Sequence, residues 1–339
     1  MVGGNAMNRY NRQTILPEVG NAGQAAIRRA HVLVVGAGGL GAPVLQYLVG
    51  AGVGQVTIVD DDFVSLSNLH RQTLFREDDI GQDKVAVAAA TLRRLNADCE
   101  IVTVTEALSP VNVQRLVAPC NLVLDCADSF AASYILSDKC FGNSTPLISA
   151  SSLGFSGYVG GFCATAPSLR AVFPDLPERT QTCATGGVLG PVVGLIGAAQ
   201  AQMALGHLIG QSPSPLGQLI SFDMQSYRTG GFRFDGAPEP KTCLGFIVAS
   251  DINKSDFVVE LRNNIEAPVR VADIAQRMTV AQFKQESITP NVAQRAVFAC
   301  RSGLRAWQAA SHLRSYWTGE ISLIAMGEMP DKVKLTTEN

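Results

Sequence analysis

The fold is decided at His31-Val32-Leu33-Val34-Val35-Gly36-Ala37-Gly38-Gly39-Leu40-Gly41. The apolar, β-branched first half predicts a buried strand, and a glycine-rich turn follows it. A helical stretch at 43–51 and a second strand at 55–59 come next. Together these elements predict a βαβ unit, in which the glycines let backbone amides approach a phosphate at the helix N-terminus.

Strand and helix candidates continue to alternate beyond this unit. Strands are expected at 100–105, 122–124 and 146–149, and helices at 112–117 and 130–141. This alternation predicts a Rossmann-like, doubly wound α/β sheet that is mainly parallel, with helices on both faces. Strand candidates at 218–223 and 231–234 follow Gly- and Ser-rich segments and predict an antiparallel extension of the sheet.

A second unit is expected after a Pro- and Gly-containing linker, because the βα alternation resumes at 257–261. A chain of 339 residues is also longer than one ordinary domain. The expected organisation is a large domain over 7–235, a linker over 236–244, a small α/β domain over 245–330 and a tail over 331–339.

Composition argues against several classes of partner. The chain has 27 Lys and Arg against 29 Asp and Glu, so no basic field points to nucleic acid or an anionic membrane. The weakly charged stretch 186–210 contains Pro191 and Gln200, which predicts a buried helix rather than a membrane span. Eight scattered cysteines without a secretory leader indicate reduced thiols and a cytoplasmic protein.

The glycine loop alone leaves its ligand open. Gly36, Gly38, Gly39 and Gly41 fit the dinucleotide fingerprint, and Asp60 at the end of the second strand is placed to hold a ribose. An NAD-dependent oxidoreductase therefore stays in view, as does a tight turn that binds nothing.

The next segment decides between these alternatives. It reads Asp60-Asp61-Asp62-Phe63-Val64-Ser65-Leu66-Ser67-Asn68-Leu69-His70-Arg71-Gln72, followed by Gly81-Gln82-Asp83-Lys84. With Arg9-Tyr10-Asn11-Arg12-Gln13, it resembles the ThiF/MoeB/HesA family, relatives of ubiquitin-activating enzymes, up to about Asp235. A dehydrogenase does not need this pattern of Asn, Arg, Gln and Lys. An enzyme that cleaves ATP between its α- and β-phosphates does need such cations.

The resemblance implies a role for each residue of this set. Asp60 would hold the ribose, and the ATP would also be bound by Asn68, Arg71, Gln72 and Lys84. Asp128, in Asp125-Cys126-Ala127-Asp128, would coordinate Mg²⁺, although Ser129 replaces the Asn that usually follows it. Arg12 would act on the nucleotide of the second subunit in a homodimer. Any one such charge alone is more often a solvated surface residue, so the interpretation depends on their joint spacing.

The implied activity is adenylation of the C-terminal glycine carboxylate of a small ubiquitin-like sulfur-carrier protein ending in Gly-Gly. Relatives usually carry two Cys-x-x-Cys pairs that bind a structural zinc. These pairs align with Ser168-Leu169-Arg170-Ala171 and Pro240-Lys241-Thr242-Cys243. One remaining cysteine cannot close a tetrahedral site, so no zinc is expected and Cys243 is interpreted as an inert remnant.

Two other cysteines are candidate nucleophiles. Cys183 precedes the long apolar helix, and its context is similar to the family's cysteine that attacks the adenylate or links to the carrier. Cys300 ends a strand at 296–300, and Cys300-Arg301-Ser302-Gly303-Leu304-Arg305 resembles a rhodanese-type sulfurtransferase loop. Backbone amides and Arg305 would stabilise a thiolate or persulfide there. A buried small hydrophobe and an incidental cysteine in a strand-to-helix turn are the competing interpretations.

The spacing of this loop separates it from phosphatase loops, which place five residues between Cys and Arg, because Cys300 and Arg305 have four between them. The rest of the rhodanese-like unit is divergent: Val258-Val259-Glu260-Leu261-Arg262 stands where that family has Asp-x-Arg. A persulfide donor would load Cys300, and the sulfur would pass to the adenylated carrier. A protein activator without sulfur transfer and a non-catalytic docking scaffold remain as alternatives.

Overall fold

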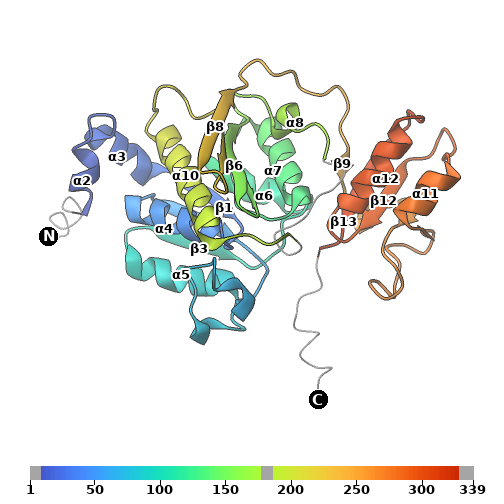
Figure 1. Ribbon diagram of the computed structural model, residues 1–339, viewed down its shortest axis with the longest axis horizontal. Coiled ribbons are helices and arrows are strands. Elements are labelled where there is room, and N and C mark those ends of the chain that lie inside the picture. The colour runs from blue at the N-terminus through green and yellow to red at the C-terminus, as the bar shows by residue number, and fades with distance from the viewer. Residues whose placement is uncertain (1–8, 177–185, 328–339) are drawn as a thin grey trace.

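The computed structural model describes residues 9–176 and 186–327, which form two α/β units on separate sheets (Figure 1). The larger sheet has the strand order β3-β2-β1-β4-β5-β6-β7-β8. Its first five strands are parallel, whereas β6, β7 and β8 each run antiparallel to the strand before them. This confirms the predicted doubly wound sheet with an antiparallel extension. The strands are β1 (His31–Val35), β2 (Gln55–Val59), β3 (Glu100–Val104), β4 (Leu122–Asp125), β5 (Leu147–Leu153), β6 (Ser156–Phe162), β7 (Gln218–Asp223) and β8 (Arg228–Arg233).

Helices cover both faces of this sheet because its central strands are apolar on both sides. Along β1, Val32 and Val34 pack into one core and Leu33 and Val35 into the other, as the period-two alternation of a strand requires. The first core is covered by α3 (Gly20–Arg29), α4 (Gly41–Ala51), α5 (Lys84–Leu95) and α10 (Gly190–Leu208). The second is covered by α6 (Val113–Val117), α7 (Phe130–Asn143) and α8 (Leu169–Val172). Short helical turns complete the unit at α2 (Asn11–Thr14), η1 (Leu66–Asn68) and η2 (Glu77–Asp79).

The C-terminal unit is a small α/β sheet with all five strands parallel, in the order β11-β10-β12-β13-β9. On one face, Phe283 of α11 and Leu313 of α12 pack with Phe298 of β12. The renewed βα alternation in the sequence predicted a small α/β unit of this kind. Its elements are β9 (Gly245–Phe246), η3 (Ala249–Asp251), β10 (Phe257–Glu260), β11 (Gln276–Arg277), α11 (Val280–Glu286), β12 (Ala296–Cys300), α12 (Leu304–Arg314) and β13 (Ile321–Ala325).

The two units meet along α7. Tyr134 of α7 is buried in the core of the C-terminal unit, and its ring centre lies 5.1 Å from that of Trp307 on α12. Gly303, in the turn before α12, also packs on this helix, since a Cβ there would lie 3.4 Å from Ala131 Cβ. Because α7 begins two residues after Asp128, the C-terminal unit contacts the helix that starts at the predicted metal ligand.

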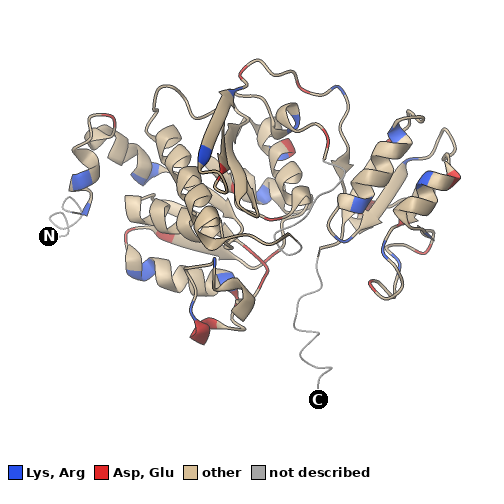
Figure 2. Cartoon of the chain, viewed as in Figure 1, with Lys and Arg blue, Asp and Glu red and all other residues tan. Residues whose placement is uncertain are grey.

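The apolar helix expected from the sequence is α10, which packs along α4. Gly197 permits this close approach, because a Cβ there would lie 2.6 Å from the carbonyl oxygen of Leu40. In the ranges that the structure describes, no helix combines the length and the apolar character needed to cross a bilayer. Basic and acidic residues are interspersed over both units (Figure 2).

Candidate active site

The glycine loop lies at the carboxyl ends of the parallel strands β1 and β4, the edge at which α/β sheets bind ligands. Gly36 has a φ of +96°, and a Cβ there would lie 2.6 Å from the carbonyl oxygen of Cys126. Gly41 begins α4, where a Cβ would overlap the carbonyl oxygen of Gly36. Only glycine fits at these two positions, which keeps the loop backbone tight against the end of β4.

Gly41→Ala is expected to lower the free energy of unfolding by more than about 2 kcal/mol, because the added methyl group overlaps backbone atoms. Gly50→Ala is the matched control within α4. Its added Cβ has open space within 4 Å, so we expect a neutral change or a gain of up to about 1 kcal/mol. Urea denaturation measures both variants, and equal stabilities would contradict the proposed tight packing.

Asp60, at the end of the strand β2, contacts the glycine loop directly. Its Oδ2 accepts the backbone N–H of Ala37 at 2.7 Å, and its Oδ1 accepts that of Asp62 at 2.9 Å. Burial raises the pKa of Asp60, and nearby Lys84 and the two amides partly oppose this. The structure therefore places Asp60 against the loop, and its contact with a ribose stays a prediction.

The predicted cations reach the same edge from the segment after β2. A Cβ at Gly39 would lie 3.5 Å from Arg71 Cγ, and one at Gly38 would lie 3.5 Å from Gln72 Nε2. Lys84 is the first residue of α5 and is 5% exposed, with its Nζ 2.5 Å from Asp62 Oδ2. The structure thus places Arg71 and Gln72 beside the glycine loop and Lys84 near Asp60, and the contact of these side chains with ATP stays a prediction.

Two amide side chains in this segment have buried oxygens with unused hydrogen-bonding capacity. Among the described residues, neither Asn68 Oδ1 nor Gln72 Oε1 has a hydrogen-bond partner. A buried acceptor without a partner costs free energy, so these oxygens indicate a place for donors of a ligand. Hydroxyl or amino groups of a nucleotide fit this requirement.

Asp128 lies on the turn after β4 and is exposed, whereas Asp125 at the end of that strand is fully buried. Burial raises the pKa of Asp125 to about 6. Its Oδ2 accepts the hydroxyl of Ser149 at 2.8 Å, and its carbonyl oxygen accepts Gln200 Nε2 at 2.7 Å. Gln200 of α10 thereby fixes the strand end that carries Asp128. Sequence analysis assigned no role to Gln200, although a polar residue inside an apolar helix was the available signal.

The donor set fits a magnesium ion that arrives with a nucleotide. Within residues 9–176 and 186–327, no group of three or more His, Cys, Asp or Glu side chains is placed to hold a metal by itself. Mg²⁺ does not need such a group, because it keeps several waters and takes one or two carboxylates together with substrate phosphates. An exposed Asp128 beside the glycine loop meets this requirement.

Arg12, which was expected to act on a nucleotide, lies away from this edge within the chain. Arg12 is exposed on α2, at the end of the molecule opposite the C-terminal unit (Figure 1). Cys183 lies outside the described residues.

Cys300 is the last residue of β12 and is fully buried. Its Sγ accepts the backbone N–H of Ala306 at 3.3 Å, in agreement with a loop lined by amides. Burial nevertheless raises the pKa of Cys300, and the amides and Arg305 offset this only in part. The amides and Arg305 thus favour the thiolate, as expected, but burial outweighs them in the arrangement seen here, and the role of Cys300 in sulfur transfer stays a prediction.

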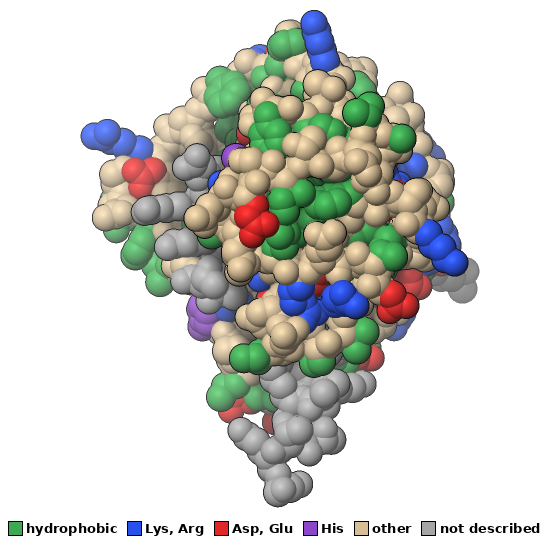
Figure 3. Space-filling model, turned by 90° about the vertical axis from the view of Figure 1, so that its right-hand side faces the viewer, with side chains coloured by type: hydrophobic (Ala, Val, Ile, Leu, Met, Phe, Trp, Pro, Cys, Tyr) green, Lys and Arg blue, Asp and Glu red, His purple; other side chains and the backbone are tan. Residues whose placement is uncertain are grey.

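Arg305 has partners of its own. The helix α12 begins at Leu304, so Arg305 lies in its first turn and not in the preceding loop. Its guanidinium pairs with the carboxylate of Glu266 and donates to the carbonyl oxygen of Leu261 at 2.9 Å. Arg305 also lines a hollow of about 500 Å³ at the carboxyl end of β10. Figure 3 faces the C-terminal unit and shows hydrophobic side chains grouped on its surface, with basic side chains below them.

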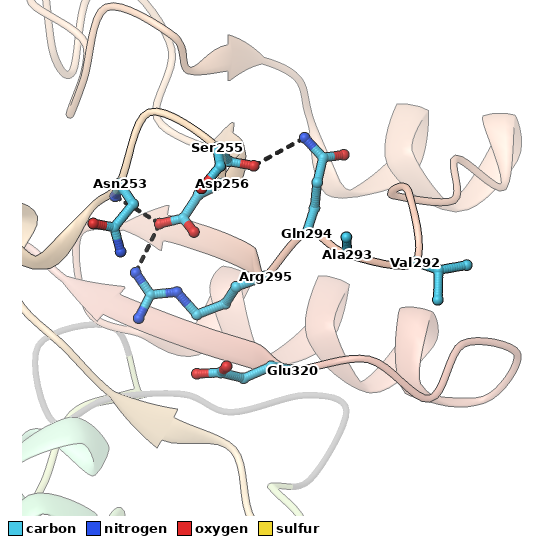
Figure 4. Close-up of a pocket in the computed structure, with 8 residues that line it drawn as sticks. All are labelled: Asn253, Ser255, Asp256, Val292, Ala293, Gln294, Arg295 and Glu320. Atoms are coloured by element: carbon cyan, nitrogen blue, oxygen red, sulfur yellow. Dashed lines mark hydrogen bonds and ion pairs between the residues drawn. The ribbon is translucent and has the colours of Figure 1, made fainter.

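A second hollow, of about 390 Å³, lies at the amino end of the strands β10 and β12 (Figure 4). Most of its polar groups pair with one another: Arg295 Nη2 lies 2.7 Å from Asp256 Oδ2, and Gln294 donates to the carbonyl oxygen of Ser255 at 3.0 Å. Because these groups are already paired, we assign no site to this hollow.

The sequence matches the ThiF family over residues 10–245. The chain belongs to the ThiF family. This confirms the resemblance drawn from the glycine loop and the segment after it, and it favours nucleotide activation over the nicotinamide alternative.

Curated relatives of this ThiF-family chain include adenylyltransferase and sulfurtransferase MOCS3 of Bos taurus, 46% identical over 225 residues, which cover 64% of this chain and 48% of that protein. SAMP-activating enzyme E1 of Haloferax volcanii is 39% identical over 219 residues, covering 64% of this chain and 81% of the relative. The MOCS3 protein of Drosophila persimilis is 35% identical over 284 residues, covering 82% of this chain and 63% of the relative. That match extends into the C-terminal unit. The chain thus spans about half the length of the bovine relative.

Solved structures support the fold. Escherichia coli MccB, crystallised with ATP, superposes with a TM-score of 0.61 at 21% identity, over 70% of this chain and 74% of that one. PaaA gives a TM-score of 0.59 at 22% identity, over 69% of this chain and 75% of that one. At this level of identity, the likeness establishes the shared fold of the larger unit.

Proposed function

We propose that this ThiF-family chain uses ATP to adenylate the C-terminal glycine carboxylate of a small ubiquitin-like sulfur-carrier protein ending in Gly-Gly. The observation that carries the proposal is the gathering of Asp60, Arg71 and Lys84 around the glycine loop, with Asp128 on the adjoining turn. A carboxylate oxygen attacks the α-phosphorus, the bond to the bridging oxygen of the β-phosphate breaks, and pyrophosphate leaves. Positive charge is required because two anions meet in this step.

Each side chain of the group supports this step in its own way. Lys84 is held in place by Asp62, an exposed carboxylate that a phosphate can replace as its partner. Asp128 would hold Mg²⁺, which supplies charge neutralisation on the phosphates when it is bound. Arg12, exposed on α2, would reach the nucleotide of a second copy in a homodimer.

A sulfur-transfer step would follow at Cys300. Two observations support it: the amide-lined loop after β12, and the words "adenylyltransferase and sulfurtransferase" in the names of the relatives. A persulfide donor gives its terminal sulfur to Cys300 and leaves as a thiol. The Cys300 persulfide then attacks the acyl carbon of the adenylate and AMP leaves, which forms an acyl disulfide. A thiol reductant releases the carrier thiocarboxylate, and a second thiol equivalent restores Cys300. Cys183 remains a candidate covalent nucleophile in this sequence of steps.

A second candidate function is activation of the same kind of carrier without sulfur transfer at this site. It is favoured by the full burial of Cys300 and by the pairing of Arg305 with Glu266, which leave the loop closed in the described arrangement. The two functions share the adenylate and differ in the product.

The adenylation proposal is tested by pyrophosphate exchange. The full chain is incubated with ATP, Mg²⁺, labelled pyrophosphate and each small ubiquitin-like protein of its own host that ends in Gly-Gly. Label is expected to enter ATP only when a carrier is present. The control is the same carrier without its last two glycines, which has no correctly placed carboxylate. Absence of exchange with every carrier would refute the proposal.

A further inference from the structure

The positions at which relatives carry zinc ligands are occupied here by a hydrogen-bonded cluster. Ser168, Ala171, Pro240 and Cys243 offer one thiol among them, and that thiol belongs to an exposed residue, so the donors present do not fit zinc. Instead, the backbone N–H and the hydroxyl of Ser168 both donate to the carboxylate of Glu239, each at 2.6 Å. These two bonds join the start of α8 to the segment that leads into the C-terminal unit.

Arg170 adds a second connection from the same turn. It is 3% exposed, and its Nε and Nη2 donate to the carboxylate of Asp138 on α7 at 2.5 and 2.8 Å. Nη2 also donates to the carbonyl oxygen of Leu244 at 2.9 Å. The guanidinium lies 4.7 Å from the ring centre of Tyr134 and 5.8 Å from that of Trp307. One side chain therefore contacts α7, the linker and the helix α12 of the C-terminal unit.

The burial of Arg170 makes this connection different from an ordinary surface ion pair. A bidentate Arg–carboxylate pair is directional, and removing one partner leaves an uncompensated buried charge. Arg314 and Asp175 also link α12 to the larger unit, at 2.9 Å, but their side chains are 33% and 64% exposed. Such an exposed pair contributes little to stability. The same interface thus contains one connection with a buried guanidinium, whose partner Asp138 is 41% exposed, and a more exposed ion pair for comparison.

We propose that the cluster of Ser168, Arg170, Asp138 and Glu239 replaces a structural zinc as the connection that fixes the linker and holds the C-terminal unit against α7. The Cys300 loop meets α7 at Gly303, so its position next to the larger unit depends on this polar cluster and not on a metal. The inference concerns the architecture of the chain and is independent of the proposed function.

Tryptic cleavage after Lys241 tests the proposal on the full chain, because Lys241 is exposed in the linker between Glu239 and Leu244. Cleavage by a protease reports the population of locally opened molecules. Asp138→Asn preserves the side-chain shape and puts a donor where Arg170 needs an acceptor. We expect it to raise the initial cleavage rate about tenfold or more. Arg314→Met should stay within about twofold of the unmodified chain.

Further measurements complete the test. EDTA is expected to leave the cleavage rate of the unmodified chain unchanged, and metal analysis is expected to find no stoichiometric zinc. Glu239→Gln, at an exposed side chain, weakens the connection between Ser168 and Glu239 and leaves the buried Arg170 paired with Asp138. It should also speed cleavage. Circular dichroism shows whether each variant is folded. The proposal is overturned by stoichiometric zinc with EDTA-sensitive cleavage, or by folded Asp138→Asn and Glu239→Gln variants that are cleaved at the unmodified rate.

Discussion

Lys84→Met is expected to reduce carrier-dependent pyrophosphate exchange by about 10³-fold, because it removes a cation placed where charge develops on the phosphates. Methionine keeps the length and apolar stem of this 5% exposed side chain, so the packing of α5 is retained. The lost ion pair with Asp62 costs little stability, since the Asp62 side chain is 58% exposed. The effect should therefore appear in the rate and not in the folded fraction.

The matched control for this variant is Arg94→Met, which removes an exposed cation from the same helix. It is expected to leave exchange within about twofold of the unmodified chain, because it lies at the other end of α5 from the glycine loop. If Lys84→Met exchanged label at the unmodified rate, Lys84 would not belong to the ATP site and the assignment of the whole segment would fail. A parallel loss in both variants would indicate a general electrostatic effect.

Local patterns were sufficient to predict the sheet and several of the residues that gather at the glycine loop. The alternation of Val32 to Val35 between two cores and the glycines that follow are properties of neighbouring residues, so they are visible in the sequence. The pattern of Arg71, Gln72 and Lys84 is also visible in the sequence. The short segment that carries these residues folds back toward the glycine loop at the end of β1. The predicted bounds of strands and helices differ from the observed ones by a few residues, as expected where helix ends fray and strands extend past their apolar run.

The contacts between distant segments could not be predicted in this way. Gln200 bonds to the carbonyl oxygen of Asp125 from a helix 75 residues away in sequence, and Arg170 reaches Leu244 across 74 residues. The pKa of Cys300 likewise depends on what buries it, and that packing involves strands and helices from the whole C-terminal unit. A loop motif indicates which atoms are available, whereas the surrounding fold decides whether a thiolate is favoured there.

Cys300→Ser is expected to abolish formation of the carrier thiocarboxylate and to leave pyrophosphate exchange unchanged. A serine hydroxyl cannot form a persulfide, and the adenylation residues lie on other elements. Intact-mass analysis of the carrier, after incubation with ATP and a persulfide donor, shows whether one oxygen has been exchanged for sulfur. Cys243→Ser is the control, because that exposed cysteine is assigned no step. If the Cys300→Ser variant still placed sulfur on the carrier, the sulfur would not pass through Cys300. Activation of the carrier without sulfur transfer at this loop would then be the function that remains.

The pH dependence of sulfur loading then tests whether the described arrangement is the reactive one. Burial raises the pKa of Cys300, so less of it is thiolate at neutral pH than for an ordinary cysteine, whose pKa is about 8.5. Because the thiolate is the nucleophile, loading from the donor should keep accelerating as the pH rises past that value. An ordinary or lower apparent pKa would show that Cys300 reacts from a different arrangement. If that arrangement involves separation of the Cys300 loop from α7, Asp138→Asn should lower the apparent pKa further, because it weakens the connection that holds the C-terminal unit against α7.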